Sequence, residues 1–427
     1  MYISRIADDK REQLTCDHLI ETAKLASDWA ESLGVKQITF LTALLHDMGK
    51  FSESFVSYLR ESEQNRRGSI IHSTQGAKYI YELASQKNDY ILIAEMVGLC
   101  IAGHHGVLMD GITPDGETPF LDRICKPDTG ALHFTEVKSE FARNCHQATK
   151  LNEMLEASTY ELQNFIKTCK NQKLNPAFMV HMLTKFIFSC LVDADRHNAY
   201  CFETQTKPVL TNPPWNKFSN NLGHFLAQKN NDSNQFIDTL RQKISDQCFC
   251  SANRRQGIYQ LEVPTGGGKT LSSLRFALEH ARIHNMERII YIIPYLSVLE
   301  QTADNIRKAL GLAKDDVCIL EHHSNLIPPD DEEKVQEKKL LTDRWDAPIV
   351  ITTVVQFLES IFSQRASKLR KLHNMTNAVL IFDEVQSLPV KCVNLFNDAV
   401  NFLSIFGKST VLLCTATQPL LDHTEHG

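Results

Sequence analysis

The hydrophobic pattern of the chain changes near residue 250, and this change restricts the possible folds more than any other feature. Before it, apolar residues recur every three or four positions, as on the buried face of a helix. One such stripe within residues 40–50 consists of Leu41, Leu44, Leu45 and Met48. Gly49 follows it and is expected to stop the helix. After residue 250, short apolar runs alternate with helical stretches: Ile258–Val263, Ile289–Ile293, Ile349–Ile351, Ala378–Phe382 and Thr410–Cys414. Strands of this length between helices are typical of a parallel sheet with crossover helices. The sequence therefore predicts a multidomain chain, an all-α domain followed by an α/β domain with a mostly parallel sheet.

Length and composition set the expected boundaries. At roughly 100–200 residues per domain, a chain of 427 residues should form two or three domains. We expect a helical domain over residues 1–203, a linker and helical lead-in over 204–250, and the α/β domain over 251–427. The linker begins with TQTKPVLTNPPW, which contains three prolines. The hydrophobic share of 43% and the charged share of 22% exclude a disordered or fibrous chain.

Composition also limits location and partners. The sequence has no run of about 18 apolar residues, and its first residues are charged, so we expect neither a membrane span nor a signal peptide. The twelve cysteines are scattered, which is typical of reduced thiols in a cytoplasmic protein. Because the net charge is −6, a site for nucleic acid must be a local patch rather than the overall charge.

The helical half contains an ordered set of histidines and acids. The motif LLHDMGK places His46 and Asp47 next to each other at the end of a helix. The other members lie far away in the sequence, so they must converge from different helices: His18, His72, His104, His105 and Asp195. Imidazole and carboxylate ligands together suit divalent Mn, Fe, Co, Ni or Zn. A carboxylate between histidines can bridge two such ions, which then activate water for displacement at a phosphoester. A single histidine is more often an ordinary core or surface residue, and it is the ordered set that favours a metal site.

These residues resemble the HD superfamily of metal-dependent phosphohydrolases. HD-x-G-K followed by HSTQGA and GHHG is similar to the HD nuclease domain of the CRISPR-associated nuclease–helicases of type I systems. The resemblance implies a first metal held by His18, His46, Asp47 and one late aspartate, and a second held by Asp47, His72, His104 and His105. It also implies catalytic roles for His46 and Asp47, and places Lys50 near the scissile phosphate. The late aspartate is either Asp193 or Asp195. By the resemblance we choose Asp195, because it precedes an Arg-x-x-Ala stretch as the family's aspartate precedes its own helix continuation.

A glycine-rich turn follows the first strand of the α/β half. The residues are Pro264, Thr265, Gly266, Gly267, Gly268, Lys269 and Thr270, and a helix follows them. Glycines let backbone N–H groups surround phosphates, while Lys269 reaches the β and γ oxygens and Thr270 holds Mg²⁺. Val263 occupies the position of the first glycine in the strict pattern, and this variant resembles the nucleotide loop of superfamily 2 helicases. We therefore expect an ATP site with Mg²⁺ on a RecA-like domain.

The second nucleotide-binding element is a later strand, AVLIF, which Asp383 and Glu384 follow directly. Parallel sheets place ligands at the carboxyl ends of their strands. The resemblance implies that Asp383 coordinates Mg²⁺ through water and that Glu384 polarises the attacking water, with Gln386 where the family often has histidine. The triplet Thr415–Thr417 resembles the motif that links nucleotide state to DNA binding.

Three further stretches are ambiguous. Residues 292–302 and 351–360 look like motifs that contact a nucleic-acid strand, through Pro294, Ser297, Gln301, Thr352 and Thr353. Taken alone, each is more often plain strand–helix packing. The sequence EHHSN at 321–325 resembles a metal cluster, but its neighbours offer no paired ligands.

The two halves together predict one function. We expect a metal-dependent single-stranded DNA nuclease coupled to an ATP-dependent DNA helicase in CRISPR type I interference, recruited by the RNA-guided, Cascade-like surveillance complex. Superfamily 2 motors need a second RecA-like domain, and the printed sequence contains none, so it should cut DNA but hydrolyse little ATP. Two alternatives remain: a nucleotide phosphohydrolase regulated by its P-loop half, and a non-catalytic, ATP-gated nucleic-acid-binding module.

Overall fold

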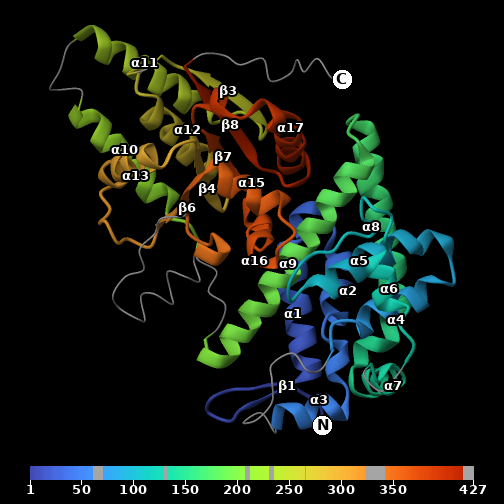
Figure 1. Cartoon of the computed structure of the whole chain (residues 1–427). Helices are drawn as coiled ribbons and strands as arrows, with labels where there is room; N and C mark the ends of the chain where they lie inside the picture. The colour runs from blue at the N-terminus through green and yellow to red at the C-terminus, as the bar shows by residue number, and fades with distance from the viewer. Residues whose placement is uncertain are drawn as a thin grey trace. The chain divides into compact units, whose positions relative to one another are not determined.

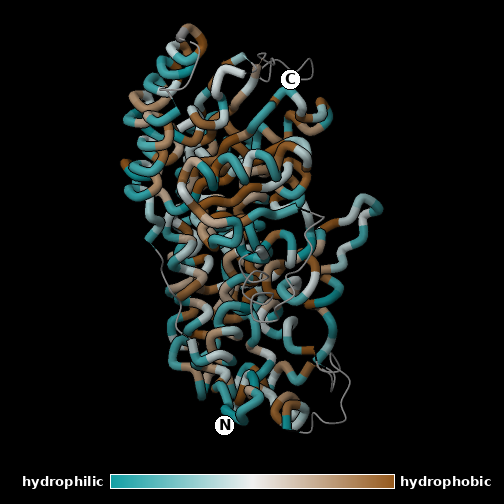
Figure 2. Tube along the Cα trace, turned by 90° about the vertical axis from the view of Figure 1, so that its left-hand side faces the viewer, coloured by the Kyte–Doolittle hydropathy of each residue, from teal (hydrophilic) through white to brown (hydrophobic). Residues whose placement is uncertain are grey.

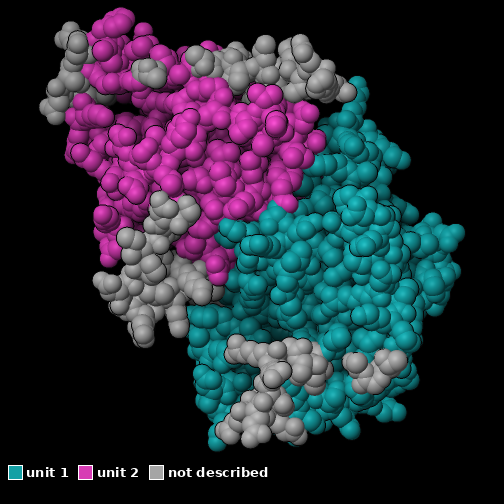
Figure 3. All heavy atoms as spheres, in the orientation of Figure 1, with its two compact units in different colours: residues 1–209, 363–373 teal, residues 210–362, 374–427 magenta. Residues whose placement is uncertain are grey.

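The chain forms two compact units. The computed structural model describes residues 1–60, 71–128, 132–206, 212–229, 235–264, 266–323 and 342–416. Unit 1 comprises Met1–Val209 together with Ser363–His373, and unit 2 comprises Leu210–Phe362 with Asn374–Gly427 (Figure 3). Unit 1 is mainly helical and unit 2 is α/β, which confirms the predicted fold class (Figure 1).

Helix α2 (Lys36–Leu45) lies at the centre of unit 1. It packs against α1 (Thr15–Trp29), α5 (Ile91–Gly103), α8 (Leu151–Asn171) and α9 (Pro176–Thr204). Its sequence after Lys36 carries no charged residue, so nearly the whole helix can be buried. The Glu161 carboxylate of α8 accepts hydrogen bonds from the N–H groups of Gln37 and Ile38, which caps the helix start.

Shorter elements surround this core. They are the hairpin β1 (Ile3–Ile6) and β2 (Glu12–Leu14), and helices α3 (Glu53–Arg60), α4 (Gln75–Ala84), α6 (Pro119–Ile124) and α7 (Phe134–Asn144). Helix α2 ends at Leu45, four residues before the expected glycine stop, and a 3-10 turn, η2 (Met48–Lys50), follows His46 and Asp47. The functional pair therefore lies in a tight turn and not inside a helix.

Helix α9 is the longest helix of unit 1. Asn175 caps its start by accepting hydrogen bonds from the N–H groups of Ala177 and Phe178, and Pro176 takes the first helical position. By length and composition alone α9 could cross a membrane, but 78% of its most apolar window is buried inside the structure. We therefore assign α9 to the core of unit 1.

Unit 2 contains a six-stranded sheet in the order β3-β8-β7-β4-β6-β5, and all of its pairs are parallel. The strands are β3 (Ile258–Glu262), β4 (Arg288–Ile293), β5 (Ile319–His322), β6 (Ile349–Thr353), β7 (Ala378–Phe382) and β8 (Thr410–Thr415). Apolar residues concentrate in the interior, while the outer helices alternate apolar and polar turns (Figure 2). Edge strand β5 was not predicted, because only its first two residues form an apolar run.

Six helices accompany this sheet in the described part of the chain. They are α10 (Trp215–Lys229), α11 (Gln235–Ser251), α12 (Lys269–Ile283), α13 (Leu296–Leu310), α15 (Val354–Phe362) and α17 (Val393–Asn401). Four of them, α12, α13, α15 and α17, lie between its strands in the sequence. Helices α10 and α11 pack on α12, so the helical lead-in expected over 204–250 belongs structurally to the α/β unit. Because every strand is parallel, the carboxyl ends of β3, β7 and β8 lie at one edge of the sheet.

Buried His280 connects α12 to β8. Its Nδ1 lies 2.8 Å from the Ala252 carbonyl oxygen and its Nε2 lies 2.7 Å from Thr410 Oγ1. A carbonyl can only accept, so Nδ1 carries the proton and Nε2 accepts from the threonine hydroxyl. Burial lowers the pKa of His280 to about 4.

We expect acid to weaken unit 2 through this histidine. The folded pKa lies below the ordinary value of about 6.5, so the unfolded chain binds the extra proton first and stability falls as the pH drops from about 6.5 to about 4, by up to about 1.4 kcal/mol per pH unit. His280→Gln lacks this proton site. The difference in melting temperature between wild type and variant should shrink between pH 7 and pH 4.5, and a constant difference would contradict the assignment.

Candidate metal centre and nucleotide site

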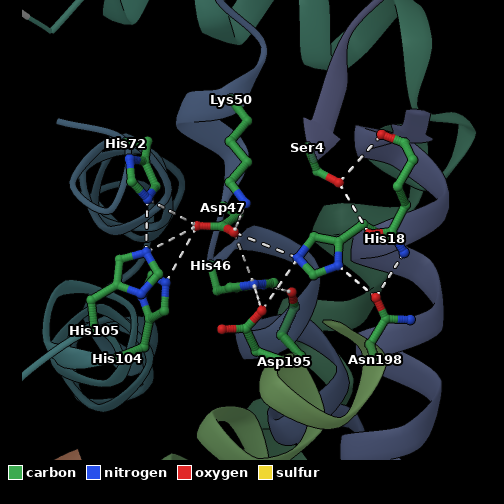
Figure 4. Close-up of polar contacts among 12 residues, drawn as sticks. Ser4, His18, His46, Asp47, Lys50, His72, His104, His105, Asp195 and Asn198 are labelled. Atoms are coloured by element: carbon green, nitrogen blue, oxygen red, sulfur yellow. Dashed lines mark hydrogen bonds and ion pairs between the residues drawn. The ribbon is translucent and has the colours of Figure 1, made fainter. Parts of the chain in front are cut away.

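Asp47 lies at the centre of the histidine–aspartate set. It lies two residues after the end of α2, at the residue that precedes η2, so the turn between these two elements carries its carboxylate. Its Oδ2 atom is 3.5 Å from His18 Nε2 of α1 and 3.4 Å from His46 Nε2. Asp195 of α9 completes this first group, with its Oδ1 atom 3.5 Å from His18 Nε2 and 3.7 Å from His46 Nε2 (Figure 4). The four residues are buried or nearly so and come from two helices, α1 and α9, and the turn after α2.

The other carboxylate oxygen of Asp47 faces a second group. Its Oδ1 atom is 3.3 Å from His104 Nε2, at the end of α5, and 3.8 Å from His105 Nε2. His72, just before α4, also places its Nε2 3.8 Å from this oxygen and 2.7 Å from His105 Nε2 (Figure 4). The His72 side chain is 21% exposed and that of His105 is 49% exposed, so this group opens to solvent.

Three of these histidines are held in one tautomer by acceptors behind them. His46 Nδ1 lies 2.7 Å from the Ala43 carbonyl oxygen, and His104 Nδ1 lies 2.7 Å from that of Ile101. His18 Nδ1 lies 2.8 Å from Asn198 Oδ1. Each Nδ1 therefore carries a proton, which leaves the Nε2 atom of each ring as the one that can bind a metal ion in the cluster. Metal-ligating histidines are oriented in this way by their outer partners.

The Asn198 amide has its own supports. It donates through Nδ2 to Glu21 Oε2 and accepts through Oδ1 from Gln13 Nε2, both at 2.8 Å. These bonds fix which side of the amide faces His18. Sequence reasoning missed Gln13, Glu21 and Asn198, because Gln13 of β2 and Glu21 of α1 meet Asn198 of α9 only in the folded chain.

The geometry fits divalent cations. Within the described part of the chain, the buried Nε2 atoms of His18, His46 and His104 have no hydrogen-bond partner. Such orphaned buried atoms are costly unless a ligand satisfies them. Two ligands bound tetrahedrally at about 2.1 Å from an ion are about 3.4 Å apart, close to the spacing seen around Asp47. The two groups share Asp47 and suit a pair of divalent ions of the Mn-to-Zn class.

Charge in the cluster is balanced locally. Lys50 places its Nζ 2.6 Å from Asp47 Oδ2. Burial opposes the charged form of Asp47, but Lys50 and the surrounding histidines hold its pKa well below the ordinary value. Burial likewise opposes the charged form of His46, but the Asp47 and Asp195 carboxylates outweigh it and raise its pKa to about 10. Partial burial and the neighbouring His104 and His72 lower the pKa of His105, which favours its neutral form. The acids thus stay ionised as ligands.

Two glycines let the segment carrying His72 approach this turn. A Cβ atom at Gly49 would lie 2.4 Å from the His72 carbonyl oxygen, and one at Gly76 would lie 2.0 Å from that of Leu45. Any side chain there would push the start of α4 away from the end of α2. Sequence analysis assigned Gly49 to a helix stop, whereas the structure uses it for this close approach.

The two aspartates near the end of the helical half, Asp193 and Asp195, have different partners in the structure. Asp195 faces the metal group, as described above, and Asp193 instead contacts Arg370 and His373 of the segment Ser363–His373. Two positions on a helix are about 200° apart, so one side chain facing the cluster excludes the other.

The glycine-rich turn connects β3 to α12. Gly266 and Gly268 adopt φ values of +78° and +84°, which side chains disfavour. Val263 stands at the position of the first glycine in the strict pattern, and its buried side chain packs against Gly267. A Cβ atom at Gly267 would lie 2.6 Å from Val263 Cγ1, so only glycine fits there. Arg241 of α11 donates through Nε and Nη2 to the Gly266 carbonyl oxygen and supports the turn from outside. Thr265 lies outside the described residues.

Lys269 contacts the two acids that follow β7. Its Nζ is hydrogen-bonded to Glu384 and lies 3.2 Å from Asp383 Oδ1. Glu384 has a φ of +48°, a strained conformation of the kind found at functional sites. Burial raises the pKa of Asp383, whereas Lys269 and Gln386 lower the pKa of Glu384 against its burial. The lysine thus neutralises two acids that would otherwise repel each other.

A cavity of about 850 Å³ opens beside this cluster within unit 2. It is lined by the turn, both acids and polar side chains of the flanking helices α10, α11 and α13, which include Pro264, Gly266, Gly268, Lys269, Thr270, Asp383, Glu384, Gln301 and Lys308. This volume lies within the usual range for pockets that bind small molecules such as nucleotides. Thr415 of β8 donates to Gln386 Oε1 at 2.7 Å and so joins two predicted motifs, while Thr417 lies outside the described residues.

Several candidate contacts serve the fold instead. Thr352 donates to the His322 carbonyl oxygen, and the Thr353 hydroxyl accepts from the Gln356 N–H. His322 Nδ1 accepts from Trp345 Nε1 at 3.0 Å, and Glu321 pairs with Arg307 at 2.6 Å. The polar groups of residues 321–322 and 352–353 therefore have partners within the fold and need no ligand. Ser324 and Asn325 lie outside the described residues.

Comparison with known proteins agrees with both halves. Residues 15–126 match the family described as HD domain, and residues 242–424 match the family described as DEAD/DEAH box helicase. The CRISPR-associated nuclease/helicase Cas3 of Haloferax volcanii is 21% identical over 98% of this chain, and the putative CRISPR-associated nuclease/helicase Cas3 of Methanocaldococcus jannaschii is 22% identical over 80%. The chain is Cas3-like.

The likeness extends to the fold. The crystal structure of T. fusca Cas3 with ADP superimposes with a TM-score of 0.57 at 15% identity and covers 97% of this chain. The Cas3-like chain spans about half the length of the relatives it matches, 49% of each curated relative and 50% of the T. fusca chain.

Gly49→Ala should disturb the second metal group alone. The new methyl group would push His72 away from Asp47, so we expect the bound Mn²⁺ to fall from about two ions to about one per chain, since a displaced ligand weakens its own site. Gly106→Ala is the matched control, because Gly106 follows His105 and nothing lies within 4 Å of the position that a methyl group would take there. Calorimetric titration measures the number of ions, and equal values for both variants would contradict the assignment.

Lys269→Ala and Glu384→Gln should separate nucleotide binding from hydrolysis. Removing Lys269 takes away the cation that faces the phosphates, so fluorescent ATP should bind at least about tenfold more weakly. Glu384→Gln keeps that cation, and we expect binding to persist while hydrolysis falls. Lys314→Ala, an exposed lysine of the same unit, is the control. Unchanged binding by Lys269→Ala would contradict the assignment.

Proposed function

We propose that this Cas3-like chain cleaves single-stranded DNA at the centre around Asp47. The observation that carries the proposal is that the two oxygens of one buried carboxylate face two different groups of histidines. When bound there, two divalent ions would supply an activated water and neutralise charge on a phosphodiester. The metal ligands we propose are His18, His46, Asp47, His72, His104, His105 and Asp195.

The chain's own residues orient this chemistry. Each Nδ1–H bond to a carbonyl or amide oxygen fixes a histidine ring before substrate arrives, so no reorganisation is needed later. Lys50 places a positive charge beside Asp47 and is suited to attract a phosphate oxygen. We infer roles in catalysis for His46, Asp47 and Lys50.

Access favours a single strand as substrate. The first group is buried, and only His72 and His105 of the second group are exposed. A stiff duplex presents its phosphates on a broad convex surface, whereas a single strand can bend its backbone toward a recessed centre. This accessibility supports single-stranded DNA, which we propose as the substrate.

We further propose that unit 2 binds ATP with Mg²⁺ and belongs to a DNA-translocating motor. Lys269, Asp383 and Glu384 meet beside the cavity, as the helicase family match implies. The resemblance to superfamily 2 implies that arginines of a second RecA-like domain complete such a site.

The printed names of the curated relatives support a role in defence. Both are described as CRISPR-associated nuclease/helicases. We propose that the protein acts in type I CRISPR interference in the cytoplasm, where an RNA-guided, Cascade-like surveillance complex recruits it to DNA.

Circular single-stranded DNA tests the nuclease directly. We expect cleavage with at least one of Mn²⁺, Fe²⁺, Co²⁺, Ni²⁺ or Zn²⁺ and none with EDTA. Asp47→Asn should lower the rate by at least about 100-fold, because the shared ligand is lost. Asp89→Asn, an exposed aspartate of the same unit, should leave the rate unchanged. Absence of cutting with every metal would overturn the proposal, and release of phosphate from small nucleotides under the same conditions would favour a nucleotide phosphohydrolase.

A further inference from the structure

One short segment belongs to unit 1 although its neighbours in the sequence belong to unit 2. Residues Ser363–His373, here called the strap, lie between α15 and β7 and fall inside the helicase family match. The strap contains the short helix α16 (Ala366–Leu369), and its residues from Leu369 to His373 are all buried.

The strap binds one face of α9. Lys185, Ser189 and Asp193 are spaced four residues apart, so they lie on one side of that helix. Lys185 Nζ donates to the Ser363 carbonyl oxygen at 2.8 Å, and Ser189 Oγ accepts from the His373 N–H at 3.1 Å. These two bonds anchor the beginning and the end of the strap.

Asp193 makes the shortest of these contacts. Arg370 Nε donates to Asp193 Oδ1 at 2.5 Å, and His373 Nε2 lies 3.3 Å from Asp193 Oδ2. The carboxylate is fully buried, and the guanidinium almost so. A buried ion pair adds little net stability compared with apolar residues of the same volume, but it fixes geometry, because each charge is costly to leave alone.

The strap also binds the loop that follows His104 and His105. The Ala366 N–H donates to the Gly106 carbonyl oxygen at 2.9 Å, and the Leu108 N–H donates to that of Gln364 at 2.8 Å. Gln364 Nε2 further donates to Asp110 Oδ1 at 2.9 Å. The strap therefore contacts elements that carry ligands of both metal groups.

We propose that Arg370 is a positioning residue of the metal centre. Through Asp193 it fixes the rotation of α9, and Asp195 on the opposite side of α9 is thereby directed at His18 and His46. This inference rests on the proposed metal site. It also means that the centre depends on residues from the helicase part of the sequence, since the strap continues without interruption toward β7 and the acids Asp383 and Glu384.

Three variants of the full chain test this role. Arg370→Met removes the charge, Arg370→Met with Asp193→Leu replaces the pair by apolar side chains, and Arg365→Met changes an exposed arginine of the same strap as the control. Two properties are measured for each: the melting temperature without metal, and the binding and visible absorption spectrum of Co²⁺, which reports coordination geometry.

We expect Arg370→Met to lower the melting temperature, to weaken one of the two Co²⁺ sites at least about tenfold and to change the spectrum, as loss of an outer partner does. The double variant should recover the melting temperature but neither the affinity nor the spectrum. Recovery of affinity together with melting temperature would overturn the positioning role, as would binding by Arg370→Met equal to that of Arg365→Met. If the wild-type chain binds no cation, the proposed function itself is overturned and this inference falls with it.

Discussion

The structure of unit 1 depends on the burial of one carboxylate among histidines. Asp47 is fully buried and its two oxygens face different histidine groups, so every helix that carries one of these residues must be held at a fixed distance from the turn after α2. Ionised acids are expensive to bury without partners. Lys50 and the ring of imidazoles reduce that cost, and a divalent ion would reduce it further. Helix α2, packed against four helices, places this turn among the elements that carry the histidines.

Long-range support reaches the site from two directions. On one face of α9, Asn198 is hydrogen-bonded to His18 and Asp195 belongs to the first group. The strap binds the other face of the same helix. The glycine contact between η2 and the segment before α4 brings in His72. Each of these contacts joins segments that are distant in sequence, so each forms only when the core is packed.

Unit 2 uses a different physical arrangement for its charges. There the acids Asp383 and Glu384 leave a buried strand at the carboxyl edge of a parallel sheet, and Lys269 reaches them from the start of α12. Backbone geometry brings these groups together, because neighbouring parallel strands end at the same edge. Likeness to Cas3 proteins covers both units, although the chain spans about half the length of the curated relatives.

The sequence by itself determined the order of helical and α/β parts, most strands, the nucleotide loop and the identity of the histidines and acids that meet. These features are encoded locally, by hydrophobic periodicity and by short motifs that can be recognised without knowing the tertiary structure. The residue types left both Asp193 and Asp195 as candidates, and the tertiary structure places Asp195 beside Asp47. Tertiary structure alone decided that Gly49 serves a close approach and that residues 363–373 join the helical unit. The sequence shows that side chains two positions apart on α9 point in opposite directions, but the packing of the whole core selects which direction faces the cluster.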